Sequence, residues 1–184
     1  MSAMTTYVAL LRGINLGPHK RIAMGELRKA LESLGYADVE TYLQSGNAIF
    51  TARKGAAAVG HEIETEVRSR FGHEVKVLVR TPEELAVVVD GNPFPEATSE
   101  PTKVHVAFLS AAPAPHRMAA LDMANHEPDE LCVGDGVIYL RYPDGAGRTK
   151  LTNDLLERRL GVTATSRNWN TVTALLDRST GSAT

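Results

Sequence analysis

The sequence contains little cysteine and no long apolar segment. Cys132 is the single cysteine among 184 residues, so no disulfide can form within the chain. One thiol and no disulfide suit a reducing compartment, and we expect a cytoplasmic protein. No apolar run approaches the roughly 20 residues that cross a bilayer, and residues 1–4 lack the basic and apolar regions of a signal peptide. We therefore expect no membrane partner.

The common catalytic and metal-binding motifs are also missing. The six histidines are scattered, none forms a His-Glu-x-x-His motif, and there is no cysteine pair, so we expect no metal site. The Gly-x-Ser-x-Gly elbow and the Walker A spacing are absent as well. We expect no cofactor and can name no catalytic residue. These absences favour a non-enzymatic protein without excluding an enzyme.

The expected secondary structure occurs twice along the chain. In the first half, apolar alternation, helical spacing and turn residues predict strand, helix, two strands, helix and strand at 6–11, 24–34, 39–43, 48–51, 56–71 and 75–80. In the second half the same order is predicted at 104–108, 115–124, 130–133, 137–141, 154–160 and 162–166. The order βαββαβ is that of a ferredoxin-like unit.

Each half is followed by a similar segment. Arg80–Asp90 and Arg167–Asp177 have the same length, the same end residues and matching apolar tails, and each predicts a short helix. Gly91–Thr102 contains three prolines and predicts a linker. We predict an α+β fold of two ferredoxin-like βαββαβ repeats, each followed by a short helix and joined by this Pro-rich linker. The expected domains are residues 5–91 and 103–178, related by internal duplication.

The net charge of −2 is unevenly distributed. Residues 1–35 hold five basic and two acidic groups, residues 148–184 hold six and three, and the stretch between them carries a balance of −8. An acidic body with two basic ends favours a local anion site. The alternative is that the basic residues lie on solvated helix faces, where oppositely charged neighbours are common.

Several specific motifs connect the chain with a known family. They are Arg-Gly-Ile-Asn at 12–15, Gln-Ser-Gly-Asn at 44–47, Asn-Pro-Phe at 92–94, the stretch 139–150, and Arg-Asn-Trp-Asn-Thr at 167–171. The chain resembles the bacterial domain-of-unknown-function family 1697 over nearly its whole length. Pro18 stands where the family usually has a glycine, and Thr149 where it often has serine. The family has no agreed activity, so the resemblance implies common ancestry but no particular reaction or ligand.

Two polar segments of the first half are candidate binding loops. Arg12 and Asn15 lie in a glycine-containing loop after the first strand, and the planar guanidinium of Arg12 suits phosphate or carboxylate. Ser45 and Asn47 lie in the expected hairpin turn, where Asn and Gly are typical turn residues. In both segments, ligand contact and ordinary turn or capping chemistry remain open alternatives.

The second half offers a further basic loop. Arg148, Thr149 and Lys150 follow a glycine-containing turn just before a helix that Thr152 or Asn153 would cap. Free N–H groups at a helix N-terminus next to cations favour anions, although an ordinary strand-to-helix connection has the same pattern. Arg167 would join Arg12 and Arg148 if the two halves meet there.

Our preferred interpretation is a non-enzymatic protein whose basic loops bind an anionic small molecule, such as a nucleotide-like metabolite, or a nucleic acid. RNA binding is weaker, because the expected third strand carries Phe50 as its one aromatic residue. A phosphate-handling enzyme that uses Arg12, Arg148, Lys150 and an acid such as Asp144 is an alternative. An interaction protein without a ligand is another.

Overall fold

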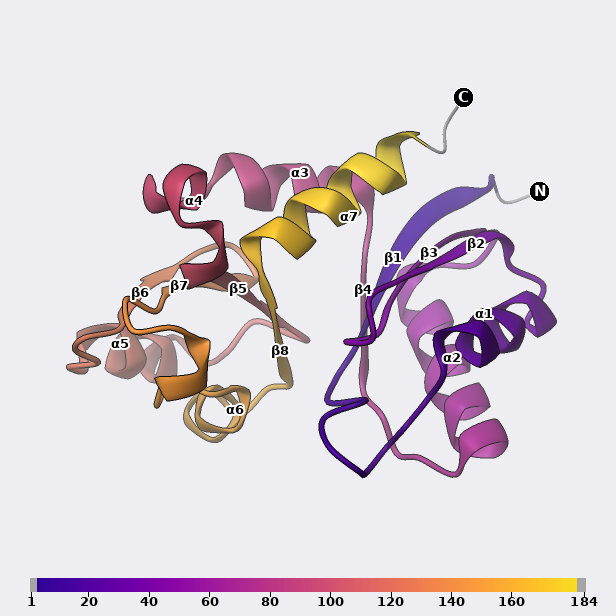
Figure 1. Ribbon diagram of the computed structural model, residues 1–184, viewed down its shortest axis with the longest axis horizontal. Helices are drawn as coiled ribbons and strands as arrows, with labels where there is room; N and C mark the ends of the chain where they lie inside the picture. The colour runs from indigo at the N-terminus through magenta and orange to yellow at the C-terminus, as the bar shows by residue number, and fades with distance from the viewer. Residues whose placement is uncertain (1–2, 182–184) are drawn as a thin grey trace. The chain divides into compact units, whose positions relative to one another are not determined.

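The computed structural model describes residues 3–181 and contains two four-stranded antiparallel sheets (Figure 1). The first repeat consists of β1 (Thr5–Leu11), α1 (Met24–Ser33), β2 (Ala37–Tyr42), β3 (Asn47–Ala52), α2 (Ala56–Phe71), β4 (Val77–Arg80) and α3 (Pro82–Asp90). Its strand order, β2-β3-β1-β4, is that of a ferredoxin-like sheet. The closing helix α3 follows the edge strand β4 directly, as the sequence predicts.

The second repeat has the same arrangement. The connecting segment holds α4 (Glu96–Ser99) and leads into a 3-10 turn, η1 (Pro101–Lys103). The repeat itself consists of β5 (Val104–Leu109), α5 (Pro115–Met123), β6 (Glu130–Val133), β7 (Val137–Arg141), a 3-10 turn η2 (Ala146–Arg148), α6 (Asn153–Leu160), β8 (Ala164–Asn168) and α7 (Trp169–Gly181). Its strand order is β6-β7-β5-β8, the order of the first sheet repeated four strands later. The equal orders confirm the predicted pair of ferredoxin-like halves and suggest duplication.

The chain forms two compact units that do not end where the repeats end. One unit comprises Met1–Leu85 with Leu175–Thr184, and the other comprises Ala86–Ala174. The boundaries fall inside α3 and α7, so each closing helix contributes to both units.

The core of the first unit lies between its sheet and two helices. Alternate residues of β1, Tyr7, Ala9 and Leu11, are buried on the face that α1 and α2 cover (Figure 1). The helices present buried apolar side chains at four-residue spacing, as the helical pattern predicts, namely Leu27, Leu31, Val59, Ile63 and Val67. In the second unit the corresponding core contains Ala107, Leu109, Ile138, Leu140, Leu121, Leu156 and Leu160.

The expected linker is more ordered than its prolines indicate. Within Gly91–Thr102 the structure places the one-turn helix α4 and the start of η1. Pro95 precedes α4 and Pro101 begins η1, positions where the fixed φ of proline is compatible with a helical turn. Proline spacing alone therefore marked this segment as a connection without showing its short helices.

The two repeats differ in which strand-to-helix connection is long. Twelve residues join β1 to α1, whereas five join β5 to α5. The pattern is reversed in the next connection, where three residues join β3 to α2 and eleven join β7 to α6. Long loops on a rigid scaffold often carry binding residues, so these two loops are the first places to seek a site.

Candidate functional site

The β1–α1 loop, residues 12–23, is organised by Asn15. Its side-chain Nδ2 donates hydrogen bonds to the carbonyl oxygens of Ile22 (2.9 Å) and Gln44 (2.8 Å). Its Oδ1 accepts from the backbone N–H of Ile22 (2.9 Å). Asn15 also has a positive φ of 56°, a conformation that asparagine tolerates better than most residues. Both the nitrogen and the oxygen of this amide are thus hydrogen-bonded, and the bond to Gln44 connects the loop to the β2–β3 turn.

A close packing contact joins the same two segments. Gly46 in the β2–β3 turn has a φ of +87°, and a Cβ atom added there would lie 2.5 Å from Cδ1 of the buried Ile14. The Gly46 carbonyl also accepts a hydrogen bond from the N–H of Leu11 (2.9 Å). The Arg-Gly-Ile-Asn and Gln-Ser-Gly-Asn motifs therefore pack against one another and form one structural feature.

A pocket of about 310 Å³ lies at this feature, lined by Asn15, Arg21, Ile22, Ala23, Met24 and Gln44. We call it the α1 pocket. Arg21 is the one charged residue in this lining, and no carboxylate is among the lining side chains. The pocket is therefore basic in character.

The backbone N–H groups at the start of α1 add to this character, whereas the carboxylate of that turn, Glu26, is paired with Lys29 (3.0 Å). The N-cap residue of α1 is Ala23, and no side chain caps this helix end. The carbonyl of Ala23 accepts hydrogen bonds from the N–H groups of Glu26 and Leu27. The N–H groups of Met24 and Gly25 have no acceptor within residues 3–181. Unsatisfied amides at a helix N-terminus carry a partial positive charge and favour anions.

The other predicted residues of this unit have local structural contacts. Asn47 is fully buried, and its Nδ2 donates to the carbonyl of Tyr42 (2.7 Å) and to Oγ of the exposed Ser45 (3.1 Å). These are the turn contacts that the sequence offered as the alternative to ligand binding. Arg12 is half-buried, and its backbone N–H donates to the carbonyl of Lys76 (2.8 Å). A ligand role for these three residues stays a prediction.

A second pocket, of about 120 Å³, lies at the long β7–α6 loop. It is lined by His126, Glu127, Pro128, Asp129, Asp144, Arg148 and Lys150, and we call it the β7–α6 pocket. The structure thus brings together Arg148 and Lys150, two predicted binding residues, with the acid Asp144. Its three carboxylates outnumber its two permanent cations, so this lining is mixed rather than basic.

Thr149 supports the wall of this pocket. Its Oγ1 donates to Oδ2 of Asp129 (2.6 Å) and accepts from the N–H of Leu151 (2.9 Å). The following helix α6 is capped by Thr152, whose side chain accepts from the N–H of Leu155 (3.2 Å). Of the two predicted cap residues, Thr152 and Asn153, the structure shows Thr152 as the cap.

Arg167 is a buried residue on β8 and not part of the β7–α6 pocket lining. Its Nη1 donates to Oγ1 of Thr165 (2.8 Å) and to the carbonyl of Ser166 (2.9 Å). Burial lowers the pKa of Arg167 to about 10. The next residue but one, Trp169, begins α7, and Asn168 caps that helix, because its Oδ1 accepts from the N–H of Thr171 (3.0 Å).

Most residues of the two pocket linings were not among the predicted binding residues, including Arg21, Gln44 and Asp129. Gln44 belongs to the polar turn motif, and Arg21 to the charged end of the β1–α1 loop, so the sequence contained a signal for both. Asp129 has no such signal, because its role depends on a hydrogen bond to Thr149, 20 residues further along the chain.

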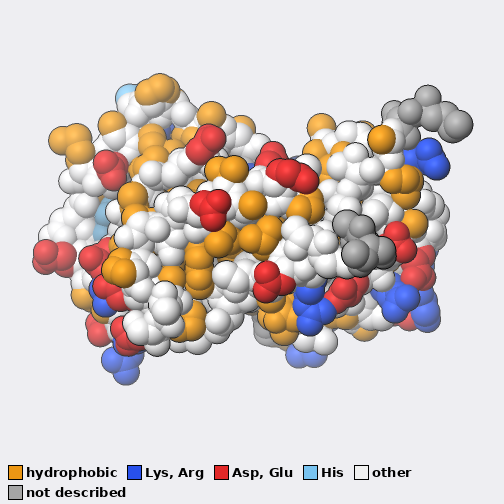
Figure 2. Space-filling view, turned by 90° about the horizontal axis from the view of Figure 1, so that it is seen from above, with side chains coloured by type: hydrophobic (Ala, Val, Ile, Leu, Met, Phe, Trp, Pro, Cys, Tyr) orange, Lys and Arg blue, Asp and Glu red, His pale blue; other side chains and the backbone are white. Residues whose placement is uncertain are grey.

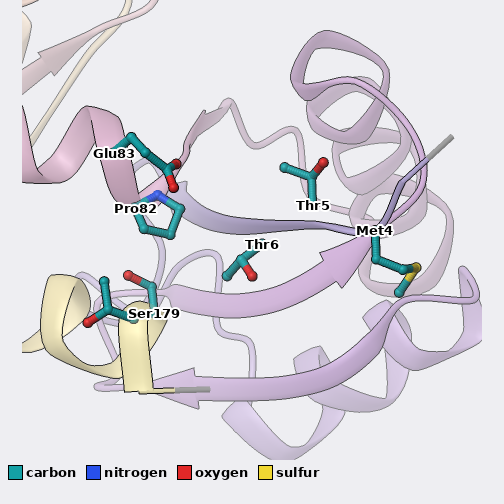
Figure 3. Close-up of a pocket in the computed structure, with 7 residues that line it drawn as sticks. Met4, Thr5, Thr6, Pro82, Glu83 and Ser179 are labelled. Atoms are coloured by element: carbon teal, nitrogen blue, oxygen red, sulfur yellow. The ribbon is translucent and has the colours of Figure 1, made fainter. Parts of the chain in front are cut away.

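A further hollow of about 370 Å³ lies beside the start of β1 (Figure 3). Its lining consists of Met4, Thr5, Thr6, Pro82, Glu83, Ser179 and Thr180. The lining has hydroxyl groups and one carboxylate but no basic group, so it does not suit an anion. Within residues 3–181 no group of three or more His, Cys, Asp or Glu side chains could hold a metal ion. No helix in that range is long and apolar enough to span a membrane.

Residues 4–139 match the family described as protein of unknown function (DUF1697), and the chain belongs to this family. Among solved structures, it is similar to conserved bacterial protein SP0830 from Streptococcus pneumoniae. That similarity covers 96% of this chain and 99% of the other, with a TM-score of 0.77 and 23% sequence identity, and it shows a shared fold. None of the curated proteins compared with the chain matches it.

Proposed function

We propose that the protein binds an anionic small molecule, such as a phosphate-bearing or nucleotide-like metabolite, in the α1 pocket. The observation that carries the proposal is the joint position of Arg21 and the uncapped first turn of α1 in one lining that has no carboxylate. The pocket volume of about 310 Å³ is at the lower end of the ~300–1,000 Å³ range of small-molecule sites.

The chemistry of the lining supports a phosphate-like group. Helix N-termini bind anions through their free N–H groups, and a guanidinium adds charge-assisted hydrogen bonds worth roughly 1.5–3 kcal/mol in favourable cases. The side-chain amide of Asn15 is already hydrogen-bonded to Ile22 and Gln44. Asn15 therefore contributes to the pocket by holding the β1–α1 loop and the β2–β3 turn together. A preformed site of this kind needs little ordering when the ligand binds.

Nucleic acid has less support as the ligand. Phe50, the aromatic residue of β3, is fully buried and stacks on Tyr36 with ring centroids 4.7 Å apart, so its face is not available to a base. On the face that Figure 2 shows, acidic side chains are interspersed with basic ones and no continuous basic stripe is visible. Both features favour a small ligand over a polyanion.

Thermal unfolding in the presence of inorganic phosphate, pyrophosphate and nucleotides tests the proposal. A ligand at ten times its Kd stabilises the folded state by about 1.4 kcal/mol, which raises the Tm of a chain of this size by about 3–6 °C. Arg21→Ala should reduce that shift. Arg28→Ala is the matched control, because Arg28 is exposed on α1 and paired with Glu32 (2.9 Å).

Three results separate the candidate functions. A shift that Arg21→Ala reduces and Arg28→Ala preserves, without turnover, supports a binding protein. Hydrolysis of a phosphoester that depends on Asp144 would instead support the enzymatic alternative. No shift with any of these anions would contradict the proposal and leave an interaction protein as the remaining class.

A further inference from the structure

Opposite charges line the β7–α6 pocket without pairing with one another. The carboxylates belong to Glu127, Asp129 and Asp144, and the cations belong to Arg148 and Lys150. Within residues 3–181 none of these five side chains forms an ion pair, although charged neighbours elsewhere in the chain do so repeatedly. Both signs of charge thus remain available to a bound molecule.

Hydrogen bonds fix the walls of this pocket. Thr149 holds the Asp129 carboxylate at 2.6 Å, and the buried Tyr142 hydroxyl donates to the carbonyl of Leu151 (3.1 Å). The loop also closes on itself, because the N–H of Gly145 donates to the Tyr142 carbonyl (2.9 Å). The charged groups are therefore carried on an ordered loop, which lowers the cost of ordering them around a ligand.

The mixture of charges determines which ligand fits. A simple anion would be attracted by Arg148 and Lys150 but repelled by the three nearby carboxylates. A simple cation would be attracted by the carboxylates but repelled by Arg148 and Lys150. A molecule with both charges satisfies both sets, and the volume of about 120 Å³ restricts it to a small one. We infer that the β7–α6 pocket binds a small zwitterion that carries an amino group and an anionic group.

This inference does not depend on the proposed anion site, because the two pockets lie on different loops of different units. NMR titration of the full chain can follow each loop separately. The probes are two zwitterions, phosphoethanolamine and β-alanine, and two single-charge compounds, ethanolamine and inorganic phosphate. We expect at least one zwitterion to shift the amides of residues 126–129 and 144–150 at lower concentration than either single-charge compound.

Two variants test the charged groups directly. Asp144→Asn and Arg148→Met, both at exposed positions, should each weaken zwitterion binding about tenfold, whereas Asp135→Asn on the β6–β7 turn should leave it unchanged. Arg21→Ala should also leave it unchanged, which separates this site from the α1 pocket. The inference is overturned if neither zwitterion shifts these amides, or if phosphate or ethanolamine alone binds as tightly.

Discussion

Substitution of Gly46 tests whether the two family motifs of the first repeat act as one structural feature. A Cβ atom at this position would lie 2.5 and 2.8 Å from two side-chain carbons of Ile14 and 3.1 Å from Cβ of Leu11. Contacts below 3.0 Å require a shift, and Ile14 is 1% exposed in a packed core with little room to move. Gly46→Ala should therefore disturb the β1–α1 loop as well as the turn.

The expected loss of folding stability in Gly46→Ala has two parts, one from the backbone conformation and one from packing. The positive φ of Gly46, +87°, disfavours any residue with a Cβ by about 1–2 kcal/mol. Overpacking against Ile14 adds about 1–3 kcal/mol. Gly46→Ala should thus lower the free energy of unfolding by about 2–5 kcal/mol.

A substitution at a second glycine, Gly35, distinguishes the backbone contribution from the packing contribution. Gly35 has nearly the same φ, +82°, but a Cβ there would meet no atom within 4 Å. Gly35→Ala should therefore cost only the backbone part, about 1–2 kcal/mol. Urea unfolding followed by far-UV circular dichroism measures both variants, and Gly46→Ala should in addition reduce the phosphate-dependent Tm shift. Equal losses of stability for the two variants would refute the packing argument.

Substitutions at three further positions have defined outcomes. Burial lowers the pKa of His105 from 6.5 to about 4, so the neutral ring contributes stability above pH 6.5 that is lost as the pH falls toward 4. Between pH 6.5 and pH 4 the free energy of unfolding, measured with urea, should fall by about 3 kcal/mol more in the wild type than in His105→Gln. The same dependence on pH in both proteins would contradict this. Arg178→Ala removes the ion pair with Glu40 and should cost about 1 kcal/mol at low salt, less at high salt; a cost independent of salt would argue against a Coulombic origin. Thr149→Val removes the bond to Asp129 and should cost about 1–3 kcal/mol in urea unfolding, whereas Thr149→Ser, which keeps the hydroxyl, should cost less than Thr149→Val.

The sequence contained most of the information on the fold, because local apolar patterns specify both repeats. The spacing of Leu27 and Leu31 predicted the buried face of α1, and the strands Glu130–Val133 and Val137–Arg141 have the predicted limits. The edge strands were placed less accurately. The strand predicted at 162–166 lies at Ala164–Asn168, because its limits follow its pairing with β5, where His105 is opposite Asn168.

The site was predicted only in part, because a pocket depends on contacts between distant residues. Local sequence identified the loops that carry Asn15 and Arg148, and both line a pocket. It could not show that the Asn15 amide would be engaged by Gln44, 29 residues away. It also could not show that Arg167 would be buried among hydroxyl and carbonyl groups of its own strand.

The backbone amide resonance of Gly25 gives the most direct test of an anion site in the α1 pocket. This amide is in the uncapped first turn of α1, next to Met24 of the pocket lining. During titration with inorganic phosphate or pyrophosphate, its resonance should shift in a saturable way in the wild type and in Arg28→Ala, and much less in Arg21→Ala. A Gly25 resonance that does not move, or that moves equally in Arg21→Ala, would contradict the account.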